Sequence, residues 1–310
     1  MSATRFTLFS MDAKTETFLD YRALLFSVAY NMLGEVEAAE DIVQDTFLKW
    51  MQMEKQDVRF IKAYLVKTVT NKCINYLDSA RVKREEYIGL WLPEPLLNYD
   101  LNKPFAKVES YHALSIGFLV LLEKLTPQER AIFLLKEVFA YDYFELAEMF
   151  DKTEENCRQI MKRARENLGK DSKRFEVDVK LHEKMLNKFL SAVSEGSLEH
   201  FIDLLKEDIT LYADGGGTVF QVNGQRLTAF PKPIYGRDHV SRSVIGSMAK
   251  LKHLPDLRQE IIIVNGLPSI LSYSGDKPIA IVSIESDGEE ILHIYIQTNG
   301  EKLKRFTKRA

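Results

Sequence analysis

The sequence predicts a multidomain protein in which two all-α domains precede an α+β domain, and the second all-α domain contains a helix-turn-helix. Three observations predict this organisation. Apolar residues recur at helical spacing from Thr15 to Arg84, and a second helical pattern with a basic end runs from Leu125 to Leu168. Beyond about Asp178, two helical stretches give way to short β-rich runs that glycine or proline turns separate.

The domain boundaries follow from these changes of pattern. We place the first domain at 1–88, a linker at 89–107, the helix-turn-helix domain at 108–172 and the α+β domain at 173–310. Gly34 interrupts the helices of the first domain, and three prolines in the linker favour an extended chain. A helix at Arg237–Leu251 lies among the strand candidates of the last domain. The strand candidates are Ile209–Ala213, Gln259–Val264, Ser269–Ser274, Ile279–Glu285 and Ile291–Thr298.

Composition indicates an ordinary globular protein. The 310 residues are 45% apolar and 28% charged, and the net charge of −3 argues against indiscriminate coating of nucleic acid. The sequence lacks a signal-like start and any apolar run of about 18 residues, so we expect a soluble cytoplasmic protein without a membrane partner. We interpret Cys73 and Cys157 as half-buried structural thiols. We expect no metal and no cofactor.

The segment from Leu125 to Leu168 carries the helix-turn-helix pattern. Thr126 and Glu129 have the spacing of a capping box, with Pro127 at the first helical position. A short helix over Tyr143–Phe150 is followed by a break at Asp151–Thr153 and then by a basic helix. The polar residues of that basic helix, which we predict to contact DNA, are Asn156, Arg158, Gln159, Lys162, Arg163 and Arg165.

Position along the basic helix suggests a division of roles. Arg158 and Gln159 lie near its start, where a recognition helix meets base edges. We assign phosphate contacts to the lysine and the two arginines that follow, because such contacts position the protein without reading sequence. The alternative is a solvated, charged surface helix.

Two further clusters lie in the first domain. Asp41, Gln44, Asp45 and Leu48 share one helix face, which would suit docking on a basic partner helix; the alternative is a solvated acidic face. Downstream, cationic and amide groups interleave with aromatic ones, a composition that can hold phosphates and unstacked bases. The residues of this second cluster are Lys62, Lys67, Asn71, Asn75, Arg81, Lys83 and Arg84.

Both helical segments resemble a known family. Tyr21–Arg84, with DIVQDTF at Asp41–Phe47, resembles the second conserved region of extracytoplasmic-function (ECF) sigma factors, and Leu125–Leu168 resembles their fourth region. The order and separation of the two regions also match, so the resemblance covers roughly the first 170 residues. It implies that core RNA polymerase binds the Asp41 face. It also implies that Lys62–Arg84 captures the −10 promoter element and that the basic helix reads the −35 element.

The last domain looks like the SnoaL-like branch of the nuclear-transport-factor-two-like fold, a cone that encloses a pocket. Three pieces match the sigma subgroup with such an extension: the linker motif Trp91–Pro95, the glycine turn Asp214–Gly217 and the terminal motif Asn299–Leu303. Thr218 stands where that subgroup has lysine, and Gly300-Glu301 replaces proline and aspartate. The resemblance implies regulatory contacts at Trp91, Pro93, Glu94, Asp214, Gly215, Gly216, Gly217 and Lys302.

The sequence therefore predicts an ECF-type sigma factor, not an enzyme, in which the last domain packs on the linker and the sigma domains and modulates activity. Two alternatives remain: a helix-turn-helix regulator that acts without polymerase, and a SnoaL-like enzyme fused to a DNA-binding module. For the enzyme, Asp214, Asp238, His239 and His293 are available, but no fixed spacing pairs an acid with a base. We interpret Asp214 as a turn residue that bonds its own backbone.

Overall fold

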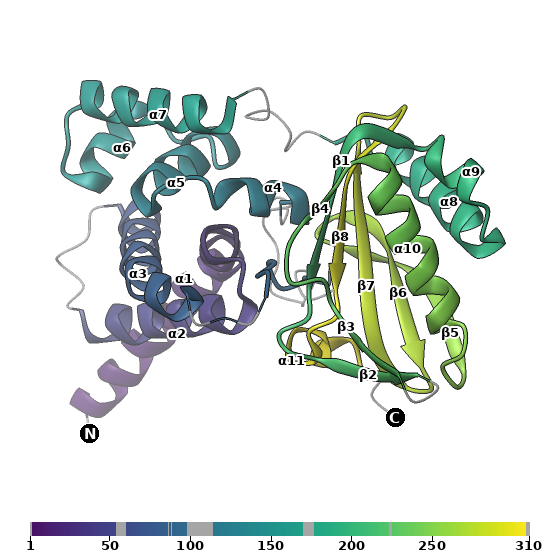
Figure 1. Cartoon of the computed structure of the whole chain (residues 1–310). Coiled ribbons are helices and arrows are strands. Elements are labelled where there is room, and N and C mark those ends of the chain that lie inside the picture. Colours follow the sequence, from purple (N-terminus) through teal and green to yellow (C-terminus); the bar gives the residue numbers. More distant parts are fainter. Residues whose placement is uncertain are drawn as a thin grey trace. The chain divides into compact units, whose positions relative to one another are not determined.

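The computed structural model describes residues 2–53, 60–85, 87, 89–97, 114–169, 177–222 and 225–307. The chain forms two compact units (Figure 1). The first unit comprises Met1–Val82, Asn98–Leu114 and Leu121–Lys173; the second comprises Lys83–Leu97, Ser115–Val120 and Arg174–Ala310. The described part contains no helix with the length and apolar character needed to span a membrane. The prediction of helical domains followed by an α+β domain is confirmed.

The first unit begins with three long helices: α1 (Ser2–Leu33), α2 (Val36–Gln52) and α3 (Ile61–Glu85). Gly34 separates α1 from α2 in a left-handed conformation with φ of 68°, as its position in the sequence predicted. Leu25, Ala29 and Val69 are fully buried, so the apolar faces of these helices form the core of the unit.

The helix-turn-helix pattern is also confirmed. Its elements are α4 (Ile116–Leu122), α5 (Pro127–Phe133), the π-helical turn η2 (Leu134–Val138), α6 (Tyr143–Phe150) and α7 (Glu154–Leu168). Thr126 and Glu129 form the predicted capping box at the start of α5, and Asp142 with Glu145 forms another at α6. Asp151 ends α6 with a positive φ of 52°, which starts the turn into α7.

The second unit holds helices α8 (Val179–Glu195), α9 (Leu198–Ile202) and α10 (Arg237–Leu251) together with the strands. The strands are β1 (Leu205–Asp214), β2 (Val219–Val222), β3 (Gln225–Thr228), β4 (Ile234–Tyr235), β5 (Leu257–Val264), β6 (Leu267–Ser274), β7 (Lys277–Ser286) and β8 (Ile291–Gln297). Two short helices follow, α11 (Gly300–Leu303) and η4 (Lys304–Phe306). The sequence missed β2, β3 and β4, because two to four residues are too few to display an alternating pattern.

Six of the described strands form one sheet in the order β4-β1-β8-β7-β6-β5, and β2 pairs separately with β3. β1 and β8 run parallel, with Tyr212 opposite Tyr295 and Asp214 opposite Gln297, while the other neighbours are antiparallel. The sheet is therefore mixed, with one parallel pair among the strands that the structure describes. A long crossover that includes α10 joins β1 to β8, and parallel pairing requires a connection of that kind.

One face of the sheet carries the main core of the second unit. Helices α8, α9 and α10 cover this face (Figure 1). Phe189 from α8 and Phe201 from α9 meet edge to face at 5.3 Å between ring centres, and Leu211, Val240 and Ile294 pack in the same cluster. This arrangement explains why α8 and α10 are amphipathic, since each buries one apolar face against the strands.

The opposite face of the sheet is covered by other segments of the same unit. Leu271 and Phe306 belong to one apolar cluster there, and Leu92 and Ile116 pack with Tyr295 in another. Because successive side chains of a strand point to opposite faces, Tyr295 faces this side while its neighbour Ile294 faces the helices. The linker and the start of α4 therefore belong to the packing of the second unit, although the sequence pattern assigned α4 to the helix-turn-helix domain.

The two cysteines are buried more deeply than the sequence analysis expected. Cys73 in α3 and Cys157 in α7 are both free thiols and fully buried. Burial raises the pKa of each thiol above its ordinary value, because an apolar surrounding disfavours the charged thiolate. The thiolate is the reactive form, so both side chains act as small core residues.

We predict that neither native cysteine reacts with a thiol reagent such as dithionitrobenzoate under folding conditions. Both should react once guanidinium unfolds the chain. A Ser194→Cys variant, with an added thiol at an exposed position of α8, should react rapidly in the native protein and serves as the control. Rapid labelling of the native wild-type chain would contradict the burial of these thiols.

Candidate polymerase and nucleic-acid interfaces and the linker cluster

Helix α7 buries one apolar face and exposes the opposite one. Thr153 caps its start by accepting a hydrogen bond from the backbone N–H of Asn156 at 3.2 Å. Cys157, Ile160 and Ala164 anchor the helix in the core. The residues expected to contact DNA all lie exposed on the other side: Asn156, Arg158, Gln159, Lys162, Arg163 and Arg165.

Several of the exposed cations on α7 are paired with acidic neighbours. Arg158 lies 2.6 Å from the Glu154 carboxylate, and its guanidinium carbon is 4.9 Å from the centre of the Tyr143 ring. Arg165 bonds Glu137 at 2.5 Å. Exposed ion pairs of this kind contribute only about 0–1 kcal/mol. A phosphate or a base edge could therefore replace them at little cost.

Helix α3 carries the second expected DNA surface. Lys62, Asn71 and Asn75 are exposed, and the Lys62 ammonium lies 5.5 Å from the centre of the Tyr141 ring. Lys67 is half-buried, and its ammonium donates to Asp151 Oδ1 at 3.2 Å and to the Glu148 carbonyl oxygen at 3.1 Å. The side chains of three further expected residues lie outside the described part of the chain: Arg81, Lys83 and Arg84.

Helix α2 presents the expected polymerase surface. Asp41, Gln44, Asp45 and Leu48 are all exposed, and half of the Leu48 side chain surface is open to solvent at 52%. The other side of the helix buries Trp50 and its apolar neighbours. Asp45 makes an ion pair with Lys72 of α3 at 2.9 Å. The structure thus keeps the four residues together on one accessible face.

The second unit contains a buried cluster that holds the linker, which we call the linker cluster: Tyr87, Trp91, Leu92, Asp214, Asn299 and Lys302. Asp214, at the end of β1, is fully buried. Its carboxylate accepts hydrogen bonds from the Leu92 backbone N–H at 2.9 Å and from the Tyr87 hydroxyl at 2.6 Å. It also bonds the Lys302 ammonium at 2.7 Å. One side chain therefore binds both the linker and the C-terminal motif.

Lys302 completes the linker cluster. Its ammonium donates to the Leu92 carbonyl oxygen at 2.5 Å, so both polar groups of that linker residue are bound. The same ammonium lies 4.6 Å from the centre of the Trp91 ring, within the range of a cation–π contact. Asn299 donates to the Tyr87 hydroxyl at 2.8 Å. The expectation that Asp214 bonds its own backbone as a turn residue is wrong, because its carboxylate is used by the linker.

The three glycines after Asp214 permit a close approach of the chain. A Cβ on Gly216 would lie 2.2 Å from Asn299 Nδ2, and a Cβ on Gly215 would lie 2.7 Å from that of Ala229. Gly216 and Gly217 also have positive φ values. Thr218 stands where the similar sigma subgroup has lysine, and its hydroxyl accepts a hydrogen bond from the Gly300 backbone N–H at 3.3 Å. Gly300 replaces the proline of the subgroup's terminal motif, so the residues that differ from the two motifs contact each other.

Further along the linker, a second set of bonds continues the attachment. Leu96 exchanges two hydrogen bonds with Asn265, at 3.0 Å to its side-chain oxygen and at 2.9 Å from its backbone N–H. Glu94 and Pro93 are buried, and Arg305 Nε lies 3.6 Å from the Glu94 carboxylate. The residues expected to make regulatory contacts thus lie together in one unit, along an extended strip of chain.

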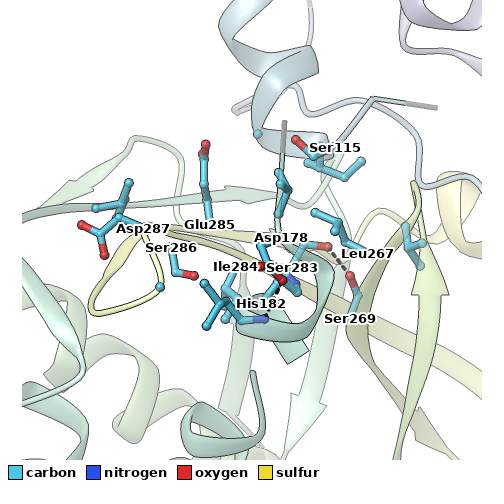
Figure 2. Close-up of a pocket in the computed structure, with 17 residues that line it drawn as sticks. Ser115, Asp178, His182, Leu267, Ser269, Ser283, Ile284, Glu285, Ser286 and Asp287 are labelled. Atoms are coloured by element: carbon cyan, nitrogen blue, oxygen red, sulfur yellow. Dashed lines mark hydrogen bonds between the residues drawn. The ribbon is translucent and has the colours of Figure 1, made fainter. Parts of the chain in front are cut away.

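A hollow of about 340 Å³ lies in the same unit and contains titratable side chains (Figure 2). His182 is buried there with Nε2 2.9 Å from the Pro268 carbonyl oxygen, and burial lowers the pKa of its ring below the ordinary value. Ser269 and Ser283 bond each other at 2.9 Å. These polar groups are therefore used as hydrogen-bond partners within the protein itself.

The side chains considered for an enzyme are also dispersed. Asp238 and His239 are exposed in the first turn of α10, whereas Asp214 is fully buried in the linker cluster. His293 packs against the rings of Tyr212 and Tyr295, at 6.0 and 6.1 Å between ring centres. Searched over the described residues, His, Cys, Asp and Glu side chains form no group of three or more that could hold a metal ion.

Comparison with known proteins identifies the two helical modules. Residues 17–82 match the family Sigma-70 region 2, and residues 117–168 match Sigma-70, region 4. The chain is 30% identical over 280 residues, covering 86% of both proteins, to the ECF RNA polymerase sigma factor SigJ of Mycobacterium tuberculosis H37Rv. The chain belongs to the ECF sigma factors of RNA polymerase.

Other relatives of this sigma factor support the assignment. The probable ECF RNA polymerase sigma factor SigI of Mycobacterium tuberculosis CDC 1551 is 26% identical over 209 residues, covering 67% of this chain and 72% of that one. The crystal structure of Mycobacterium tuberculosis SigJ superposes with a TM-score of 0.70 at 25% identity, covering 94% of this chain and 97% of the other. The similarity therefore includes the α+β unit, which has the SnoaL-like cone fold.

Sequence reasoning missed two residues of this sigma factor: Tyr87, which bonds Asp214 and Asn299, and Asn265, which binds the linker at Leu96. Tyr87 lies just outside the linker motif and carries no pattern that distinguishes it from any other aromatic residue near a helix end. Asn265 precedes Gly266, a pair that signals a tight turn, and its φ of 51° fits that role. The turn was predictable from these two residues. Its bonds to Leu96, 169 positions away, were not.

We predict that Asp214→Asn destabilises the second unit by about 3–5 kcal/mol, because the substitution removes one charge of a buried ion pair whose other member, Lys302, has a side chain only 11% exposed. Denaturant unfolding measures the loss. The backbone amide hydrogen of Leu92 should also exchange with solvent faster in the variant than in the wild type. Asp276→Asn is the matched control, since that side chain is 94% exposed beside Arg258 and should change stability by no more than about 0.5 kcal/mol. Equal effects of the two substitutions would contradict the role of the buried pair.

Proposed function

We propose that this sigma factor docks on core polymerase through the exposed face of α2 and contacts promoter DNA through α3 and α7, while its C-terminal unit restrains the linker. The linker cluster carries the regulatory part of this proposal. Asp214 and Lys302 bind the backbone of Leu92 on both sides. An extended linker held in this way cannot change its path without the exposure of a buried ion pair.

The −35 contact is assigned to α7. Its exposed side carries arginine, lysine and amide groups, and its N-terminal end is capped and rigid. The stacking of Arg158 on Tyr143 orients the guanidinium before DNA arrives, which reduces the entropy lost on binding. We therefore assign base recognition to Arg158 and Gln159, and phosphate contacts to Lys162, Arg163 and Arg165.

The −10 contact is assigned to α3. Asn71 and Asn75 follow Lys67 at intervals of one helical turn, so the three residues can track one strand. In this structure, however, Lys67 bonds Asp151 in the turn between α6 and α7. Binding of the −10 strand through Lys67 therefore requires that this bond be given up. Because the Asp151 side chain is 84% exposed, the exchange costs little.

The polymerase contact is assigned to α2. The face combines two carboxylates and an amide with the exposed Leu48 side chain. An apolar anchor surrounded by polar groups is the usual composition of a protein interface. This feature distinguishes a sigma factor from a helix-turn-helix regulator that acts without polymerase, for which the α2 face would have no use.

The direct test of the function is run-off transcription with purified core polymerase. The intact chain should give a transcript with a defined start site, and core polymerase alone should not. A failure to gain start-site selectivity would overturn the assignment. The same assay tests restraint by the linker cluster: Asp214→Asn should raise the yield of transcript over the wild type, and Asp276→Asn should not. A lower yield, with folded protein verified by circular dichroism, would contradict restraint.

For α7, we predict that Arg158→Ala lowers the affinity of the holoenzyme for its specific promoter by about 1–3 kcal/mol more than for a scrambled one. Arg163→Ala should weaken both by similar factors and make the salt slope shallower by about one. Fluorescence anisotropy at several salt concentrations measures both effects. Lys188→Ala, an exposed lysine of α8, is the control. Equal losses on the two promoters with Arg158→Ala would remove its base-reading role.

For α2, we predict that Leu48→Ala weakens binding to core polymerase by about tenfold, because a well-packed apolar anchor contributes 1 kcal/mol or more to an interface. Phe60→Ala removes a similarly exposed apolar side chain, 65% exposed, outside α2. It should change the affinity less than about twofold. A binding curve unaffected by Leu48→Ala would place the docking surface elsewhere.

A further inference from the structure

The outer side of α10 is basic, and the contacts proposed above make no use of it. We call this side the α10 surface: Arg242, Ser243, Gly246, Ala249 and Lys250. We propose that the α10 surface binds the phosphate backbone of DNA next to the −35 element. The C-terminal unit would then add a contact that does not read sequence to those of α3 and α7. This inference rests on the proposed DNA contact of α7, because α7 brings the duplex within reach.

The five residues of the α10 surface share one side of the helix. With 3.6 residues per turn, they fall within an arc of about 120° around its axis. Val240 and Val244 on the opposite side are buried in the core of the unit, so the direction in which the α10 surface faces is fixed. Arg242, Ala249 and Lys250 are exposed. A rise of 1.5 Å per residue separates the two cationic residues by about 12 Å along the axis.

The cations of the α10 surface are not neutralised locally. Neither Arg242 nor Lys250 forms an ion pair with an acidic side chain in the part of the chain that the structure describes. The one acidic residue of α10, Asp238, lies in the first turn of the helix. Lys252 follows the helix, and its exposed side chain is held by a bond of 3.1 Å to the Ser194 carbonyl oxygen. Positive charge that has no local counter-charge attracts a polyanion.

The composition of the α10 surface favours DNA over a protein partner. Protein interfaces are centred on large apolar or aromatic anchors, as the exposed Leu48 side chain would be on α2. The centre of the α10 surface carries Gly246 and Ala249 instead. Phosphate oxygens are bound mainly by arginine, lysine and hydroxyl groups, which Arg242, Lys250 and Ser243 supply. The surface therefore matches a phosphate backbone, to which such groups contribute position but no sequence preference.

The chain between the two helical elements is short enough to bring the α10 surface to the same duplex. Ten residues, 169–178, join the end of α7 at Leu168 to the start of α8 at Val179. An extended chain of this length spans at most about 40 Å, slightly more than one turn of DNA. Helix α8 packs with α10 in the second unit. Because the tether makes the second contact intramolecular, a weak attraction to phosphates is sufficient.

Phosphate contacts of this kind have a quantitative signature in the salt dependence of binding. Each contact releases counter-ions from DNA and steepens the plot of log affinity against log salt concentration by about 0.9. Contacts from Arg242 and Lys250 together contribute about 1.8 to the slope. Between 50 and 200 mM salt, that contribution alone corresponds to a change of about twelvefold in affinity.

The first test measures the salt slope with the full-length chain, core polymerase and a promoter fragment that extends beyond both elements. Fluorescence anisotropy reports binding at several salt concentrations. Arg242→Gln combined with Lys250→Gln should make the slope shallower by about 1.8. Lys232→Gln combined with Lys277→Gln is the matched control, because it removes the same charge from exposed positions elsewhere in the second unit. The control should leave the slope unchanged.

A second pair of variants separates charge from bulk. A Cβ on Gly246 would meet nothing within 4 Å, and both glutamate and glutamine favour helix more than glycine does, so both substitutions fit. Gly246→Glu puts a carboxylate between the two cations. It should bind promoter DNA about fivefold more weakly than Gly246→Gln at low salt, the effect of two like charges about 4 Å apart in water. The difference should shrink as the salt concentration rises.

The outcomes distinguish this inference from the proposed function. A wild-type holoenzyme that binds no promoter would overturn both. If the wild type binds and transcribes, a double variant of Arg242 and Lys250 with the wild-type slope overturns the α10 contact and leaves the proposed function intact. A change of slope equal to that of the control pair has the same meaning. Equal affinities of Gly246→Glu and Gly246→Gln at low salt would likewise overturn the contact.

The place of the contact on DNA is measured by crosslinking. Ala249→Cys provides an exposed thiol on the α10 surface for a photoreactive label, while Cys73 and Cys157 are buried. In the bound holoenzyme, the label should crosslink to DNA outside the −35 element and within about two helical turns of it. Lys277→Cys carries the same label at the control position and should crosslink far less. Equal yields from the two positions, or crosslinks confined to the −10 element, overturn the inference.

Discussion

The buried carboxylate of Asp214 is the point on which the second unit depends. It is fully buried at the end of β1, and it binds the linker backbone at Leu92, the Tyr87 hydroxyl and the Lys302 ammonium together. A charge removed from water is tolerated only where several donors replace the lost hydration, and here segments separated by more than a hundred residues supply them. The Asp214 carboxylate therefore couples three features, because each is needed to satisfy its hydrogen bonds: the position of the linker, the conformation of the glycine turn and the docking of the terminal helix.

The surfaces of the first unit proposed to contact polymerase and DNA follow a different physical rule. Their polar side chains are exposed and engage acidic neighbours on the same unit, as Arg158 does with Glu154 and Lys67 with Asp151. Exposed pairs of this kind are weak and readily exchanged, so they keep cations oriented without committing them. The chain thus combines easily exchanged contacts on the surfaces proposed to meet partners with a buried, costly contact at the linker. This contrast is what the proposed restraint of the linker requires.

Much of the fold was predictable from local pattern. The capping box at Thr126 and Glu129, the break at Gly34 and the amphipathic helices α8 and α10 depend on residues close in sequence, and each was confirmed. The strands β5 to β8 were predicted for the same reason. The parallel pairing of β1 with β8 was not, because register between strands some 80 positions apart depends on the crossover and on the shared core. The depth of Cys73 and Cys157 likewise depends on which helices pack over them.

The sequence by itself determined the order of the modules, the helix-turn-helix and the residue types on its exposed faces, because periodicity and capping are local properties. In the sequence, the linker motif Trp91–Pro95, the glycine turn Asp214–Gly217 and the terminal motif Asn299–Leu303 could be identified only through resemblance to a family. Tertiary structure alone decided that these three motifs meet at one carboxylate and that Tyr87 and Asn265 join them. The reason is physical: a buried polar group selects its partners by three-dimensional proximity, and nothing in the local sequence around Asp214 distinguishes a turn residue from an anchor.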